Sequence, residues 1–193
     1  MRIVGGVWRG RVVEAPRGRE VSRPTTDRVR EACASVIESA LDGGIEGAHV
    51  LDAFAGTGAM GLEMLSRGAA TATFFDTDRG AAALVWRNLA ALGCGRDRAQ
   101  VTCADVVRAA ACGRMVGAPF DVVLIDPPYA LGAAPAEELL TALSTHGLLA
   151  EGAVALFERT SSTPVLVVPG FESIREKRYG QTCIDVLRYG SSA

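Results

Sequence analysis

The sequence Asp126-Pro127-Pro128-Tyr129 follows the apolar run 120–125 and contains residue types suited to binding a planar amine. Two adjacent prolines fix the backbone angles and remove two hydrogen-bond donors. The Asp126 carboxylate and the Pro127 carbonyl remain as acceptors beside an aromatic ring. Two acceptors can bind both hydrogens of a ring-attached amino group while Tyr129 stacks on the ring. These contacts would stabilise the positive charge that develops on nitrogen when such an amine attacks an electrophile, and Asp126 is a candidate to take the proton afterwards.

A glycine-rich turn supplies a second candidate site. The stretch 51–63, LDAFAGTGAMGLE, contains the pattern G-x-G-x-x-G at Gly56, Gly58 and Gly61. The first two glycines allow the backbone to approach a ligand closely, and Gly61 allows a helix to pack closely on a strand. Asp76 lies 20 residues after Gly56, where an acid can bind ribose hydroxyls. The pattern fits NAD or any other nucleoside-bearing cofactor, and a tight turn without ligand is the alternative.

Two further acids favour a different cofactor from NAD. Asp52 precedes the turn, where a dinucleotide phosphate would need neutral donors but an ammonium group would be stabilised. Asp105 follows a predicted strand and is an acceptor suited to an adenine amino group. With the glycines and Asp76, these acids resemble the class I S-adenosylmethionine (SAM) methyltransferases, whose product is S-adenosyl-L-homocysteine. Asp78 ranks below Asp76 for the ribose. The resemblance implies a cofactor site formed by Asp52, Phe54, Gly56, Thr57, Gly58, Asp76 and Asp105.

Within that fold, the stretch 126–129 resembles the (D/N)PPY motif of amino-methyltransferases. Those enzymes act on adenine N6, guanine N2, cytosine N4 or a glutamine amide. The resemblance implies that Asp126, Pro127, Pro128 and Tyr129 form the catalytic site. A proline-rich turn with a buried tyrosine is the alternative interpretation of the motif alone.

The order of elements predicts an α/β fold around these motifs. Apolar strands are expected at 48–54, 70–76, 99–105, 120–126 and 153–159, separated by helices at about 58–67, 79–92, from 106 to about 114, and 135–145. A final β pair is expected at about 171–178 and 182–189. This alternation predicts a doubly wound, mostly parallel sheet. The resemblance to class I SAM methyltransferases implies that it is the Rossmann-like, seven-stranded sheet of that family. In such a sheet the ligand binds beyond the carboxyl ends of the strands.

The first 30 residues differ from the rest in charge. They contain eight arginines and three acidic residues, a net charge of +5, whereas the remainder carries −7. We expect a β-hairpin within 2–15, a loop at 16–26 and a helix that begins near Thr25 or Thr26. Residues 1–24 would form a basic extension, and 25–193 the methyltransferase domain with its leading helix. A basic extension suggests a polyanionic partner, and a solvated charged face is the alternative. The candidate RNA-binding residues are Arg9, Arg11, Arg23, Thr25, Arg28 and Arg30.

The N-terminal sequence also resembles one bacterial family over about 30 residues. A G-x-x-[RK]-G-R stretch (6–11), an R-P-T-x-D-R-x-R-E segment (23–31) and an LD-x-F-A-G-[TS]-G pattern (51–58) are similar to 16S ribosomal RNA (guanine-N2) methyltransferases. The closing stretch 178–189 matches as well, so the resemblance covers nearly the whole chain. Asp76 is a mild departure, since many relatives carry glutamate. The resemblance implies methylation of a guanine N2 amine in 16S rRNA, within an assembled or assembling small subunit.

Composition limits the remaining possibilities. The five cysteines are scattered and only two histidines occur, so we expect neither disulfides nor a metal site. With no signal peptide or membrane span apparent, we expect a cytoplasmic protein, and a monomer. The alternatives are a SAM-dependent enzyme for DNA adenine N6 or a protein glutamine, an NAD oxidoreductase, and a non-enzymatic RNA-binding assembly factor. A glutamine enzyme would have little use for eight N-terminal arginines.

Overall fold

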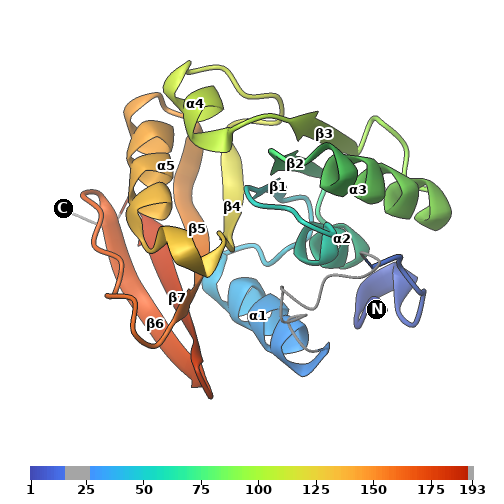
Figure 1. Cartoon of the computed structure of the whole chain (residues 1–193), viewed down its shortest axis with the longest axis horizontal. Helices are drawn as coiled ribbons and strands as arrows, with labels where there is room; N and C mark the ends of the chain where they lie inside the picture. Colours follow the sequence, from blue (N-terminus) through green and yellow to red (C-terminus); the bar gives the residue numbers. More distant parts are fainter. Residues whose placement is uncertain (16–26, 191–193) are drawn as a thin grey trace.

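A seven-stranded sheet organises the molecule (Figure 1). The structure is a computed structural model that describes residues 1–15 and 27–190. The strand order is β3-β2-β1-β4-β5-β7-β6, with β1 to β5 parallel and the last two strands antiparallel to their neighbours. The strands are β1 (His49–Asp52), β2 (Thr71–Asp76), β3 (Ala99–Cys103), β4 (Phe120–Ile125), β5 (Leu149–Thr160), β6 (Phe171–Tyr179) and β7 (Thr182–Tyr189).

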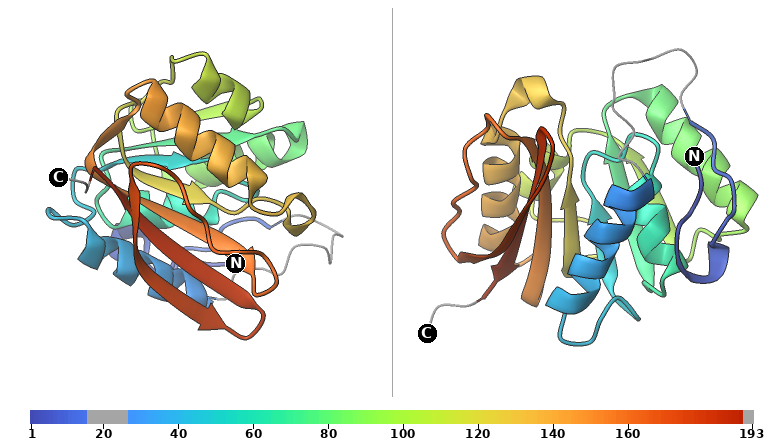
Figure 2. Two further views of the ribbon diagram at one scale, coloured as in Figure 1. Left: turned by 90° about the vertical axis from the view of Figure 1, so that its left-hand side faces the viewer. Right: turned by 90° about the horizontal axis from the view of Figure 1, so that it is seen from below.

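Helices cover both faces of this sheet (Figure 2). On one face, α1 (Asp27–Ala40), α2 (Ala59–Ser66) and α3 (Arg79–Leu92) share one buried cluster with the strands. On the other face, α4 (Val106–Ala111) and α5 (Ala134–Thr145) share a second cluster. Burial of both faces explains why the parallel strands are continuous apolar runs rather than alternating ones.

The alternating part of the chain confirms the predicted fold class. Helix α3 has the predicted bounds, and each predicted strand corresponds to an observed one within a few residues. Helix α1 buries Cys33, Val36, Ile37 and Ala40 at the predicted helical spacing. Its predicted cap, Thr25 or Thr26, lies outside the described residues. A short 3₁₀ turn, η2 (Tyr129–Leu131), was not predicted.

The N-terminal segment corrects one prediction. Instead of two paired strands, residues 1–15 contain a single antiparallel bridge between Arg2 and Val12 and a 3₁₀ turn, η1 (Gly6–Trp8). The two arms still face each other through hydrogen bonds from the N–H groups of Ile3, Gly10 and Val13 to the carbonyls of Arg11, Ile3 and Met1, each at 2.9 Å. They form no regular strands because other backbone N–H groups bind the body of the protein. Those of Val4 and Gly5 each donate to the Glu63 carboxylate at 2.8 Å. The segment is therefore docked on a helix rather than folded as a regular hairpin.

Buried polar residues of α2 and α3 hold this segment. Glu63 is fully buried and also pairs with Arg67 at 2.8 Å. Asn88 accepts from the Glu14 N–H at 2.7 Å, and its amide donates to the carbonyls of Glu14 and Thr57 at 3.1 Å each. Because Thr57 belongs to the glycine turn, Asn88 links the N-terminal segment directly to the candidate cofactor site.

Candidate active site

The candidate site lies where the strand order changes direction, between β1 and β4. The glycine turn follows β1, and the sequence Asp-Pro-Pro-Tyr follows β4. Parallel pairing aligns Asp52 with Leu124 and Ile125 with Phe157, so Asp52, Asp126 and Glu158 come from the carboxyl ends of three adjacent strands. This edge of a doubly wound sheet is the usual ligand site. The structure thus brings together the two motifs that the sequence separates by about 70 residues.

The glycine turn has a backbone that favours glycine. Gly56 and Gly58 have φ angles of +53° and +76°, which other residues adopt rarely. A Cβ at Gly56 would meet no atom within 4 Å, so open space lies beside the turn. A Cβ at Gly61 would collide with the Phe74 ring and lie 2.9 Å from Asp52 Oδ2. The prediction that Gly61 allows close packing of helix on strand is therefore confirmed.

Asp52 is a buried carboxylate at the start of this turn. It is 5 % exposed, and its Oδ2 accepts from the Gly61 N–H at 2.9 Å. Burial raises the pKa of Asp52 to about 7; the Gly61 hydrogen bond opposes this rise and the Asp76 carboxylate adds to it. A cation placed beside Asp52 would offset the cost of burying its charge. An ammonium group is such a cation.

The acids after β2 and β3 adjoin the same edge. Asp76 Oδ2 accepts from the Gly56 N–H, and Oδ1 from the Asp78 N–H, both at 2.8 Å. Each oxygen keeps a second lone pair that can accept a hydroxyl. Asp105 caps α4 and accepts from the Arg108 N–H at 3.1 Å through one oxygen. Asp78 caps α3 through the Ala81 N–H at 2.9 Å, which gives it a structural role.

The side chains around this turn fit a nucleoside that carries an ammonium group. Asp52 is a desolvated acid whose charge a bound cation would stabilise. Asp76 has acceptors for vicinal hydroxyls, and exposed Asp105 has an oxygen left for an amino group. Phe54 and Thr57, both half-buried, come from the same turn. Among the described residues no cluster of three or more His, Cys, Asp or Glu side chains is placed to hold a metal ion.

Asp126 lies in an acidic environment. Its pKa is raised well above the usual value because surrounding protein atoms desolvate the carboxylate, and the charges of Glu158 and Asp52 add to the effect. The side chain nevertheless keeps solvent-accessible surface, so a substrate can reach it. A carboxylate with a raised pKa is a stronger base than an ordinary one.

Glu158 is a site residue that the sequence analysis missed. The Tyr129 hydroxyl donates to Glu158 Oε1 at 3.1 Å, and Glu158 is only 9 % exposed. Tyr129 is 43 % exposed, which leaves surface for stacking. Partial desolvation raises the pKa of Tyr129; Glu158 adds to the rise, while Thr182 at the start of β7 opposes it. An acid near the end of the predicted apolar strand 153–159 is the signal that could have identified Glu158.

The structure separates the candidate RNA-binding residues. Arg9 and Arg11 are exposed, and Arg11 Nη2 donates to the Ala91 carbonyl at 2.6 Å near the end of α3. That end of α3 lies at the amino edge of the sheet, opposite Asp126. Arg28 is exposed in the first turn of α1, nearer the site. Arg23 and Thr25 lie outside the described residues.

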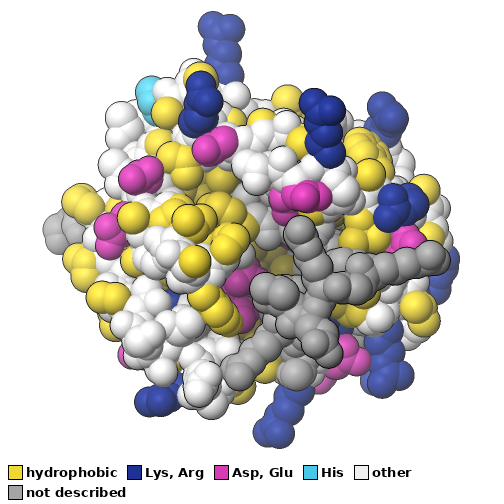
Figure 3. Space-filling view, viewed as in Figure 1, with side chains coloured by type: hydrophobic (Ala, Val, Ile, Leu, Met, Phe, Trp, Pro, Cys, Tyr) yellow, Lys and Arg dark blue, Asp and Glu magenta, His cyan; other side chains and the backbone are white. Residues whose placement is uncertain are grey.

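Arg30 is turned into the protein. It is 2 % exposed, and its Nη2 donates to the Arg2 carbonyl at 2.8 Å and to Asp27 Oδ1 at 2.6 Å. In this arrangement the guanidinium joins the N-terminal segment to α1 instead of facing a ligand. Figure 3 shows Lys and Arg side chains spread around the rim of one face rather than gathered in a single patch.

Comparisons with known proteins agree with this geometry. Residues 1–188 match the model of the family described as "Conserved hypothetical protein 95". The Escherichia coli (strain K12) protein "Ribosomal RNA small subunit methyltransferase D" is 39% identical over 184 residues, which are 94% of this chain and 86% of that protein. The Haemophilus influenzae protein of the same name is 32% identical, over 93% of this chain and 89% of its own.

Solved structures show the same architecture. The Escherichia coli protein "Putative methyltransferase yhhF" superimposes with a TM-score of 0.82 at 35% identity, over 100% of this chain and 99% of that chain. A methylase structure from Haemophilus influenzae gives a TM-score of 0.78 at 26% identity, over 98% of both chains. Within the described ranges, no helix combines the length and apolar character required to cross a bilayer.

Proposed function

This chain belongs to the "Conserved hypothetical protein 95" family, and from that premise we propose that it transfers a methyl group from SAM to the N2 amine of a guanine in 16S rRNA. One observation carries the proposal: Asp126-Pro-Pro-Tyr follows β4 directly beside the glycine turn after β1. The names of the relatives support methylation of small-subunit rRNA. Guanine N2 rests on the motif and on the resemblance of residues 6–11 and 23–31.

The cofactor would be held by the side chains around the glycine turn. Asp52 would pair with the methionine ammonium, Asp76 would bind the ribose hydroxyls and Asp105 the adenine amino group. The remaining surface would be lined by other residues of the turn: Phe54, Thr57 and the positive-φ glycines Gly56 and Gly58. When bound, SAM supplies a methyl group on a positively charged sulfur. The buried Asp52 carboxylate would be stabilised by the incoming cation, so binding and its ionisation are coupled.

The four residues after β4 would hold the amine. The Asp126 carboxylate and the Pro127 carbonyl would accept its two hydrogens, and Pro128 would fix the backbone that presents them. Tyr129, held by Glu158, would stack on the base. These acceptors would stabilise the positive charge that develops on the nitrogen as it takes the methyl group. The proton would then pass to Asp126, whose raised pKa suits this role.

The substrate experiment uses small ribosomal subunits from cells that lack the gene. Purified protein and methyl-labelled SAM are incubated with these subunits, with naked 16S rRNA and with duplex DNA. We expect one labelled guanine, identified as N2-methylguanine by mass spectrometry of the digested RNA. Label on a DNA adenine or on a protein glutamine, or the absence of label from RNA, would overturn the proposal. We expect the enzyme to be cytoplasmic and to act on the subunit as a monomer.

A variant separates catalysis from cofactor binding. Asp126→Ala should bind SAM with nearly unchanged affinity, because Asp126 contacts the amine in our proposal, and should lose methyl transfer. Calorimetry measures the first property and label incorporation the second. A fully active Asp126→Ala protein would contradict the mechanism.

A further inference from the structure

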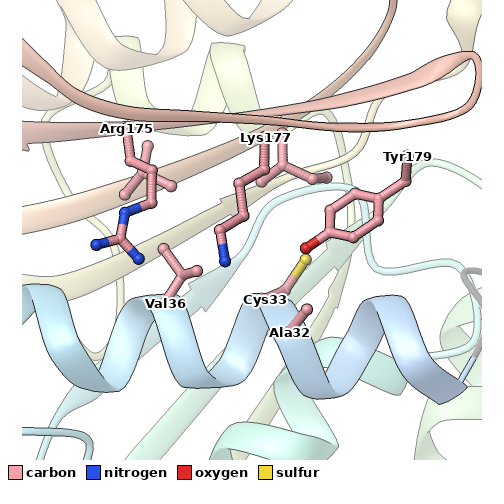
Figure 4. A pocket seen from close by; sticks show the side chains of 8 residues that line it. Ala32, Cys33, Val36, Arg175, Lys177 and Tyr179 are labelled. Carbon is pink, nitrogen blue, oxygen red and sulfur yellow. The ribbon is translucent and has the colours of Figure 1, made fainter.

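A groove between α1 and the β6–β7 hairpin has a charge distribution that the proposed reaction leaves unexplained. Figure 4 shows its floor on α1 and the side chains that point toward it from β6. The α1 residues are small or apolar, whereas β6 contributes two cations and a tyrosine. The groove continues into a hollow of about 220 Å³ that Arg188 also lines. Its central lining is Ala32, Cys33, Val36, Arg175, Lys177 and Tyr179.

The β-strand alternation directs Arg175 and Lys177 to the same side. Arg175 aligns with Val186 and Lys177 with Ile184, and these two apolar residues are buried in the α1 cluster. Both cations are exposed, and neither has an ion pair with any carboxylate in the described part of the chain. Unpaired cations above a neutral floor can bind an anion without first breaking an internal contact.

The opposite side of β6 is different. There Glu176 pairs with Arg159 at 2.8 Å, and Arg178 donates to the Gly180 carbonyl at 2.9 Å. At the far end of the groove Glu172 aligns with Arg188, whose guanidinium donates to the Ala40 carbonyl at 2.6 Å. The available positive charge is therefore concentrated at Arg175 and Lys177.

One end of the groove adjoins the candidate active site. Ile184 of β7 aligns with Glu158 of β5 on one side and with Lys177 of β6 on the other, so Lys177 lies two strands from the acid that binds Tyr129. Tyr179, at the end of β6, pairs in register with Thr182 at the start of β7, and Thr182 lowers the pKa of Tyr129. Arg28 lies one helical turn before Ala32 on α1 and is exposed. The cations thus lead toward the residues that would hold the amine.

We propose that this groove binds the phosphodiester backbone of the RNA strand that flanks the methylated nucleotide, with Arg175 and Lys177 as phosphate ligands. This inference rests on the proposed function. The candidate site is rich in carboxylates and the chain has a net charge of −2, so RNA needs local cations in order to approach. The exposed side chains of Arg175 and Lys177 can meet a backbone that lies along the mouth of the groove, and arginine is suited to phosphate. The predicted contacts at Arg9 and Arg11 lie at the other edge of the sheet.

The test compares two variants that each remove two positive charges. Arg175→Ala/Lys177→Ala removes the proposed ligands. Arg114→Ala/Arg178→Ala is the control, with one exposed arginine before β4 and one on the opposite side of β6. All four side chains are exposed, so both variants should fold. The measurements are SAM affinity, kcat and KM on small subunits, and RNA affinity over a series of salt concentrations.

We expect the groove variant to bind SAM normally and to keep kcat within about twofold while KM rises about tenfold or more. The slope of log affinity against log salt should become shallower by about 0.7 for each phosphate of single-stranded RNA that the variant no longer binds. The control should resemble the wild type. Equal behaviour of the two variants would overturn the proposal.

Two further outcomes show whether the proposed function or the assignment of the groove to RNA is wrong. If wild-type protein methylates no RNA, the proposed function fails, and the RNA affinities of the variants still test the groove by themselves. If polyglutamate binds wild-type protein as tightly as RNA does and is equally sensitive to the groove variant, the site is a general polyanion site. That result would overturn the assignment to RNA.

Discussion

At the scale of single residues, the pair Tyr129–Glu158 determines how the motif after β4 is presented. The Tyr129 hydroxyl is bound to Glu158 at 3.1 Å, and the Glu158 charge also raises the pKa of Asp126. One carboxylate therefore affects both the ring that would stack on the base and the group that would accept its proton. Replacing Glu158 with an amide or with alanine separates these two effects.

We expect Glu158→Gln to keep an acceptor for Tyr129 but to lower the pKa of Asp126, because a like charge is removed. If transfer requires ionised Asp126, the acid limb of the kcat/KM profile should move to lower pH. Glu158→Ala should also release Tyr129 and reduce kcat/KM by about ten- to a hundredfold. The measurements are pH–rate profiles at fixed salt. Glu172→Gln on β6 is the control, and an unchanged profile for Glu158→Gln would refute the role.

Sequence analysis identified those candidate residues that lie in a recognisable motif. Asp52 and Asp76 end apolar strands and Asp105 and Asp126 follow them, so sequence alone could place all four at one edge. Glu158 could not be linked with Tyr129 because the contact depends on the register between β4 and β5. Arg30 was expected to face RNA, since one chain segment gives no indication of which arginines are internal.

At the scale of elements, the docking of residues 1–15 on α2 depends on a buried acid. Glu63 Oε1 accepts from the Gly5 N–H and from Arg67, and Oε2 accepts from the Val4 N–H. Ser66 extends this contact, because its hydroxyl accepts from the Trp8 N–H at 2.9 Å and donates to the Gly5 carbonyl at 2.6 Å. The segment is thus bound by side chains of a helix that begins in the glycine turn.

Glu63→Ala should lower the free energy of unfolding by about 2–5 kcal/mol, because it leaves two N–H groups and a partly buried arginine without a partner. Urea denaturation measures the loss, and hydrogen exchange at residues 3–8 should increase at the same time. The exposed Glu138→Ala on α5 is the matched control and should change stability by less than about 0.5 kcal/mol. Wild-type stability in Glu63→Ala would show that the docking contributes little.

Helices and strands whose apolar residues recur at a regular spacing could be predicted from the sequence. The structure of residues 1–15 could not. Residues 48–160 alternate between apolar runs and amphipathic stretches, which identified each strand and helix near its observed place. Residues 2–15 also alternate in part, but they form no regular strands, because the N–H groups of Val4, Trp8 and Glu14 bind Glu63, Ser66 and Asn88. Those partners lie about 60 to 75 residues away in sequence, so no local pattern reveals them.

At the scale of the whole molecule, the fold concentrates acids where its strands converge. The doubly wound, seven-stranded sheet could be predicted from the order of elements and the family resemblance. The effect of this arrangement on the pKa values of the acids could not be predicted, because it depends on how deeply each acid is buried. Asp52 and Asp126 both have raised pKa values, and neighbouring carboxylates contribute to each rise. The stability of the protein should therefore depend on pH.

The sign follows from Asp52, whose pKa is about 7 in the folded protein against an ordinary value of 3.8. Between these pH values the folded state retains a proton that the unfolded chain has released. The free energy of unfolding should then decrease as pH rises from about 4 to about 7 and level off above that range. Each unit of pKa difference corresponds to about 1.4 kcal/mol. Thermal unfolding of the ligand-free protein at pH 5, 6, 7 and 8 measures this decrease.

SAM should show the opposite dependence on pH. Its ammonium group would bind the ionised form of Asp52, so affinity should rise with pH across the same window, and SAM should raise Tm more at pH 8 than at pH 6. Asp52→Asn should unfold with a weaker dependence on pH, should be at least as stable as wild type at pH 8 without ligand, and should bind SAM weakly at every pH. Asp126 still titrates in that variant, so any remaining dependence of stability on pH comes from Asp126 and its neighbours. A SAM-induced rise in Tm that is equal at pH 6 and pH 8 in the wild type would exclude Asp52 as the partner of the ammonium group.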